Sequence, residues 1–144
     1  MEQLVQKLKI VQASTFSFYL KAHNYHWNVT GPNFAQYHGY LGDLYEEVFG
    51  SVDEWAENIR KLNAVAPGSL SRFSELTVIE DELNVPDALS MMGRLYNDNA
   101  RLLGEMYAVV KMAEDMNQCG LVNFIEGRID VHEKHAWMLR SFIG

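Results

Sequence analysis

Two histidines and three carboxylates are the residues in this chain whose types and spacing best suit chemistry. His38 lies twelve residues after His26, and Glu46, Asp53 and Glu57 follow it, the last two separated by four positions. Imidazole nitrogens and carboxylate oxygens are ligands of first-row metals such as iron and zinc. The set therefore predicts a metal centre, provided that the fold can bring these side chains together.

The elements that must position these residues are helices, because apolar residues recur every three or four positions along most of the chain. The pattern predicts four long helices over about 2–29, 34–62, 86–113 and 122–143, with Pro86 at the first position of the third and Asn33 as the cap of the second. Residues 70–85 form a longer crossover with one short helix near 71–76. The sequence thus predicts an all-α four-helix bundle in a single domain, 1–144.

The candidate ligands share one side of the second predicted helix. At 100° per residue, His38, Glu46, Asp53 and Glu57 fall within an arc of about 100°, beside the apolar stripe rather than on it. The turn at Gly31 and Pro32 should bring His26 back towards His38. His23 is predicted to lie on the surface.

Distance prevents one helix from using this whole polar stripe for one metal. His38 and Asp53 are separated by roughly 22 Å along a helix, whereas ligands lie about 2–2.3 Å from a first-row metal. If the second helices of two copies pack antiparallel about a two-fold axis, His38 of one copy meets Asp53 and Glu57 of the other, twice per interface. The alternative is that Asp53 and Glu57 are a solvated i, i+4 pair and that the histidines are only helix-end residues.

Histidines elsewhere give weaker signals for metal binding. None of the glutamates has a histidine three residues later, which argues against the di-iron pattern that some four-helix bundles place in their interior. His132 continues the apolar stripe of the fourth helix and is predicted to be a hydrogen-bonded core residue. His132 and His135 have a spacing that suits a metal, but the sequence offers them no obvious third ligand.

Composition excludes several classes of protein. With 12 Lys and Arg against 19 Asp and Glu, the net charge is −7, which argues against non-specific binding of nucleic acid. A single cysteine, Cys119, cannot form an internal disulfide and favours a reducing compartment, the cytoplasm. No apolar run approaches the roughly 20 residues of a membrane span, and the N-terminus does not read as a signal peptide.

The run from His26 to Phe34, followed by His38, Asp53 and Glu57 and then by 66–68 (Ala-Pro-Gly), closely resembles the Dps family of mini-ferritins. The ending 132–140, His-Glu-Lys-His-Ala-Trp-Met-Leu-Arg, is similar to the family's last helix. The resemblance covers nearly the whole chain. It implies a ferritin-like bundle, assembly into a hollow dodecamer, and oxidation of Fe(II) by hydrogen peroxide, or by oxygen, with storage of ferric iron inside the shell.

By position, the resemblance implies that His26 and His38 come from one subunit and Asp53 and Glu57 from its partner, with Trp27 beside the site. One departure concerns Gly42, because the family usually has an aspartate at this place. Glu46, one turn further on the same side, is a candidate replacement ligand; the alternative is that it simply faces the interior of the shell. The missing carboxylate leaves two readings open, an active ferroxidase and a shell that sequesters metal with little or no oxidation.

The family takes its name from DNA protection, so a DNA-condensing role is a third hypothesis. The core pattern extends from Leu4 to Ile143, which leaves no basic tail at either end of this sequence, and the net charge is negative. The sequence therefore argues against direct DNA binding and leaves open an association bridged by Mg²⁺. The partners it predicts are further copies of the chain, Fe(II) and an oxidant, with no membrane.

Overall fold

The computed structural model describes all residues 1–144 and contains five helices and no strand. The helices are α1 (Glu2–Asn28), α2 (Phe34–Lys61), α3 (Leu70–Leu76), α4 (Ala88–Asp115) and α5 (Cys119–Ile143). Four are long and one, α3, is a short helix in the crossover between α2 and α4. The predicted four-helix bundle is confirmed.

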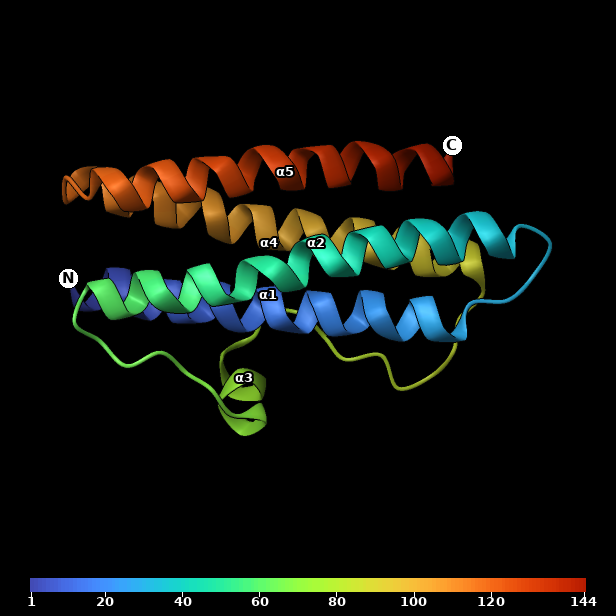
Figure 1. The fold of residues 1–144 in the computed structure, drawn as a ribbon, viewed down its shortest axis with the longest axis horizontal. Helices are drawn as coiled ribbons and strands as arrows, with labels where there is room; N and C mark the ends of the chain where they lie inside the picture. The colour runs from blue at the N-terminus through green and yellow to red at the C-terminus, as the bar shows by residue number, and fades with distance from the viewer.

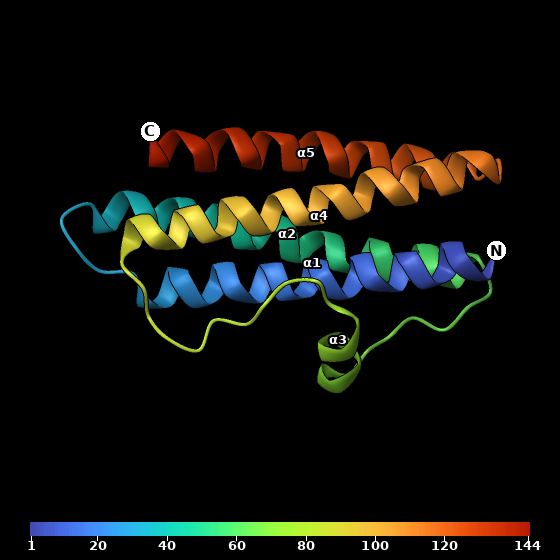
Figure 2. The same cartoon turned by 180° about the vertical axis from the view of Figure 1, so that it is seen from behind.

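The long helices lie side by side, with α1 and α5 running in one direction and α2 and α4 in the other (Figure 1). Since α2 and α4 are parallel, the chain must travel most of the length of the bundle between them. The crossover does so along the side of α1, and α3 packs there (Figure 2). No helix combines the length and the apolar composition that a bilayer crossing requires.

A continuous core explains why the four amphipathic helices associate. Twenty-three buried apolar residues form one cluster to which all four long helices contribute. Trp55, Tyr25 and Phe18 are the bulkiest of its fully buried side chains. Burying such side chains is the main driving force for the fold, at about 1.5–3 kcal/mol each. The polar stripe of α2 lies beside this core, so its side chains are free for other roles.

The helix ends differ from the sequence prediction at two positions. Pro86 was predicted to begin the third long helix, but α4 begins at Ala88, because Asp87 accepts a hydrogen bond from the N–H of Ser90 (2.9 Å) and caps the helix. Asn33 does occupy the N-cap position of α2, yet its side chain makes no capping bond. The predicted cap is therefore right in place and wrong in mechanism.

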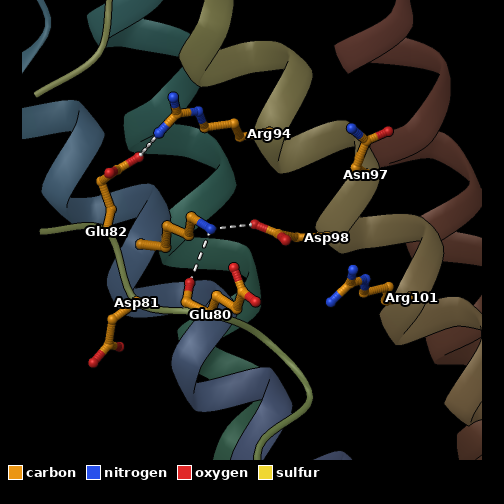
Figure 3. A pocket seen from close by; sticks show the side chains of 8 residues that line it. Glu80, Asp81, Glu82, Arg94, Asn97, Asp98 and Arg101 are labelled. Carbon is orange, nitrogen blue, oxygen red and sulfur yellow. Dashed lines mark hydrogen bonds and ion pairs between the residues drawn. The ribbon is translucent and has the colours of Figure 1, made fainter. Parts of the chain in front are cut away.

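Charged side chains attach the crossover to the bundle (Figure 3). Lys21 of α1 forms an ion pair with Asp98 of α4 (2.9 Å) and donates a hydrogen bond to the backbone carbonyl of Glu80 (2.9 Å). Burial raises the pKa of Asp98, and the contact with Lys21 opposes that rise. Lys21 thus ties α1, α4 and the crossover together.

A second set of contacts between the crossover and the bundle lies beside that of Lys21. Glu82 of the crossover accepts hydrogen bonds from the hydroxyl of Tyr25 (2.6 Å) and from Arg94 (2.5 Å). A cavity of about 260 Å³, lined by polar residues alone, lies between these two sets of contacts. Lys21 pairs with Asp98 and Arg94 with Glu82 at this cavity. These ion pairs hold the crossover on the bundle, so the charges there have a structural role.

Candidate metal centre

His26 and His38 meet at the hairpin between α1 and α2. The Nδ1 atom of His26 lies 2.8 Å from the carbonyl oxygen of His38, and the Nδ1 atom of His38 lies 2.8 Å from the carbonyl oxygen of His26. The two rings stack with their centroids 3.7 Å apart and their planes inclined by 17°. The turn that contains Gly31, with φ at 118°, therefore brings the two histidines together as predicted.

This reciprocal bonding fixes the protonation of both rings. A carbonyl oxygen can only accept a hydrogen bond, so each Nδ1 must carry the proton when the imidazole is neutral, and each Nε2 keeps its lone pair. Histidines that bind metals commonly donate their other ring N–H to a carbonyl in this way. His26 and His38 are thus held in the tautomer that leaves Nε2 as the ligand atom for a divalent cation.

Gly42 is part of the same contact. A Cβ atom at this position would lie 3.1 Å from Cε1 and 3.3 Å from Nδ1 of His26, which is closer than such contacts normally are. The imidazole of His26 therefore lies directly against the backbone of α2. The glycine that the sequence marked as a missing ligand is also the residue that makes room for His26.

The carboxylates of the polar stripe do not join the histidines within one chain. Asp53, Glu57 and Glu46 are all exposed, and no three side chains from His, Cys, Asp and Glu lie close enough together to hold a metal ion. The structure thus brings His26 and His38 together and leaves Asp53 and Glu57 further along α2. This is the separation that the helix arithmetic requires.

An aromatic stack lies beside the two histidines. The ring of His23 is 3.8 Å from that of Trp27 and 3.7 Å from that of Tyr45, and its Nδ1 is 3.0 Å from the hydroxyl of Tyr19. The prediction of a surface position for His23 is corrected, because these rings cover both faces of the imidazole and leave it half-buried. Burial lowers the pKa of His23, the charge of His26 lowers it further, and Glu46 opposes the shift.

A second polar cluster, which the sequence did not reveal as a unit, lies between α2, α4 and α5. His132 is completely buried and bonds to Asn99 (2.8 Å), as predicted for a core histidine. Arg128 bonds to both His132 and Glu47, and Glu47 bonds to His135. The sequence signals for this cluster are the i, i+4 spacing of Arg128 and His132 and the i, i+3 spacing of His132 and His135 on α5.

Comparison with known proteins agrees with this architecture. The sequence profile of the ferritin-like domain matches residues 5–144. The chain is 30% identical over 143 residues to the DNA protection during starvation protein of Brevibacillus brevis, covering 99% of this chain and 96% of that protein. This chain belongs to the Dps family of ferritin-like proteins.

Solved Dps structures have the same fold. The Dps protein from Bacillus brevis superposes with a TM-score of 0.95 at 28% identity, covering 99% of this chain and 96% of that one. Dps from Vibrio cholerae O1, described as a member of a superfamily of ferritin-like diiron-carboxylate proteins, matches with a TM-score of 0.95 at 26% identity and covers 99% and 90% of the two chains. Membership of this family makes the chain a mini-ferritin of the iron-storage type.

Proposed function

We propose that this mini-ferritin oxidises Fe(II) at centres shared by two copies of the chain and stores the ferric product inside a hollow shell, by resemblance a dodecamer. His26 and His38 of one copy bind the iron, and Asp53 and Glu57 of the other complete the site. The observation that carries the proposal is the pair of histidines whose Nδ1 protons are both committed to carbonyl oxygens. That commitment leaves two Nε2 lone pairs at a place where no carboxylate of the same chain completes a site.

The chemistry follows from the two kinds of ligand. Imidazole nitrogens suit Fe(II), and carboxylate oxygens stabilise the higher charge of Fe(III), so adding Asp53 and Glu57 favours loss of an electron. With hydrogen peroxide as oxidant, two Fe(II) each give one electron, and the peroxide takes up two protons and becomes two waters. When both electrons reach the same peroxide molecule, no hydroxyl radical is released.

His23 and Glu46 affect the electrostatic potential near the site. Burial lowers the pKa of His23, which favours its neutral form and so reduces its repulsion of an incoming cation. Glu46 is exposed and close enough to His23 to act on its pKa, so it contributes negative charge near the site. Glu46 is an auxiliary metal ligand, in a role secondary to Asp53 and Glu57.

The second candidate function is a shell that sequesters metal with little oxidation. Gly42 favours it, because the family's usual carboxylate is missing there. Stopped-flow measurements of Fe(II) oxidation, with peroxide and with oxygen in parallel, separate the two. Rapid oxidation that is lost in His38→Ala supports the ferroxidase, whereas stoichiometric Fe(II) binding without rapid oxidation by either oxidant would establish the sequestering shell.

The remaining elements of the proposal come from composition. The net charge of −7 disfavours direct contact with DNA phosphates, so we assign the chain no direct DNA-binding role and leave a Mg²⁺-bridged association as the alternative. The single cysteine, which is free and exposed, is compatible with the reducing cytoplasm, which we propose as the compartment.

A further inference from the structure

The cluster of Glu47, Arg128, His132 and His135 has the composition of a metal site except for its arginine. Glu47 comes from α2 and the other three from consecutive turns of α5. Arg128 is 8% exposed, His132 0% and His135 8%, so these three side chains are removed from water. Glu47 is the partly exposed member and marks the side from which an ion would enter.

The guanidinium of Arg128 lies between the carboxylate of Glu47 and the imidazole of His132. It donates to both carboxylate oxygens of Glu47, at 2.5 and 3.0 Å, and to Nε2 of His132 at 3.1 Å. Nε2 of His135 lies 2.7 Å from Oε1 of Glu47. Glu47 and His132 thus contact one positive charge, and His135 joins the cluster through Glu47.

The protonation of His132 shows that its free nitrogen faces this charge. Its Nδ1 lies 2.8 Å from Oδ1 of Asn99, while Nδ2 of Asn99 donates to the carbonyl oxygen of His132 at 2.9 Å. The second bond orients the amide, so Oδ1 must accept a hydrogen bond from the protonated Nδ1, and Nε2 keeps its lone pair. Histidines that bind a metal through Nε2 have this tautomer. Here Nε2 accepts a hydrogen bond from the guanidinium of Arg128 instead.

We propose that Glu47, His132 and His135 form a second cation site inside the bundle. The guanidinium of Arg128 occupies this site and keeps divalent metals out of it. Without the guanidinium, two imidazoles and one carboxylate would offer the three protein ligands of a His₂Glu site, with water as a fourth. Such a donor set selects borderline divalent cations such as Zn²⁺, Co²⁺ or Fe²⁺. His135 would then carry its proton on Nδ1 and bind through Nε2.

Arg128 therefore determines where this protein can bind metal. In the structure, with the guanidinium in place, no three candidate ligands lie close enough to hold an ion, so Glu47, His132 and His135 must draw together around a metal once Arg128 is removed. The inference does not depend on the centre proposed for His26 and His38, because it concerns different residues and different helices.

The test is equilibrium binding of Co²⁺ to the intact protein, followed by dialysis and by visible absorption. We expect Arg128→Ala to bind one more Co²⁺ per chain than the wild type. Arg128→Lys, the matched control that keeps a cation, should gain none. Adding Glu47→Gln to Arg128→Ala should abolish the extra site, and Co²⁺ should raise the Tm of Arg128→Ala much more than that of Arg128→Lys.

Arg128→Ala leaves the Glu47 charge without its partner and is expected to be less stable. Arg128→Gln, whose amide can still bond to Glu47, is the second variant and should also gain Co²⁺. The proposal is overturned if a folded Arg128→Ala or Arg128→Gln binds no more Co²⁺ than the wild type, or if Arg128→Lys gains as much as they do.

Discussion

Gly42 lies against the imidazole of His26, so that a Cβ atom added to the glycine would stand 3.1 Å from Cε1 of the ring. The contact links α2 to the end of α1 at the place where His26 and His38 exchange hydrogen bonds. A substitution at Gly42 therefore changes two things, the space for His26 and the number of ligands. The sequence revealed only the second.

Comparing Gly42→Ala with Gly42→Asp separates these two effects. Alanine stabilises a helix interior by about 1 kcal/mol relative to glycine, but its Cβ must displace His26 by a few tenths of an ångström. We expect Gly42→Ala to slow Fe(II) oxidation by about two- to fivefold, equivalent to roughly 0.5–1 kcal/mol. Gly42→Asp should be faster than Gly42→Ala, because it adds an oxygen donor. Stopped-flow rates for the three proteins check this, and equal rates for both variants would show that the carboxylate adds nothing.

Mixed oligomers test whether His38 and the pair Asp53 and Glu57 belong to one site. A His38→Ala parent and an Asp53→Asn/Glu57→Gln parent should each be inactive. In a mixed two-fold interface, one site receives both defects and the other receives none. Random mixing makes about half of the interfaces mixed, so about a quarter of the wild-type activity should return. No recovery after verified subunit exchange would place the sites within single chains.

Assembly is the third prediction. Several large apolar side chains are exposed in the isolated chain, including Leu83 (88%), Val85 (62%) and Trp137 (54%), and these are available for contacts between copies. We expect a closed homo-oligomer, by family resemblance a dodecamer. Light scattering at micromolar concentration gives the mass directly. A stable monomer there would contradict both the shared centre and storage within a shell.

Binding to DNA should be absent under ordinary conditions. The net charge of −7 disfavours the approach of phosphates, and we expect little affinity from counterion release. The protein should not retard plasmid DNA at neutral pH and physiological salt without divalent ions. Retardation in the presence of EDTA would refute this; retardation that requires Mg²⁺ would support the bridged association.

Stability should fall as the pH is lowered through the range in which histidines titrate, because of His132. Burial holds the pKa of His132 well below its usual range, and the positive charge of Arg128 has the same effect. Below pH 6.5 the unfolded chain takes up a proton that the folded protein does not bind. The free energy of unfolding should therefore decrease by at most about 1.4 kcal/mol per pH unit, from pH 6.5 down to the folded pKa.

The groups around His132 support this sign. His135, on the same helix, also lowers its pKa and Glu47 of α2 raises it, while Asn99 of α4 and Phe18 of α1 carry no charge. Urea unfolding between pH 7.5 and 5 measures the slope, and His132→Gln is the control. The pKa of Glu47 lies well below its usual range; burial alone would raise it, but the bonds from His135 and Arg128 outweigh that effect. Glu47 therefore adds no slope above pH 5, and an unchanged slope in His132→Gln would contradict the prediction.

The sequence by itself determined the helices, the bundle and the face of α2 on which the candidate ligands lie. These features follow from local periodicity, since a helix fixes the direction of each side chain from its position along the chain. The same rule, together with the rise per residue, separated His38 from Asp53, so that one metal site using both residues would need a second copy. The hairpin that brings His26 to His38 was also readable, from its glycine and proline.

Only the tertiary structure decided what depends on atoms from different helices. The contact between Gly42 and His26, the stack around His23 and the pairing of Glu47 with Arg128 each join residues whose approach is set by how two helices pack. Periodicity gives the face of a residue but not its opposing neighbour, and a buried charge is stable only if that neighbour compensates it. For this reason the sequence identified His132 as a core residue and did not reveal the arginine that it faces.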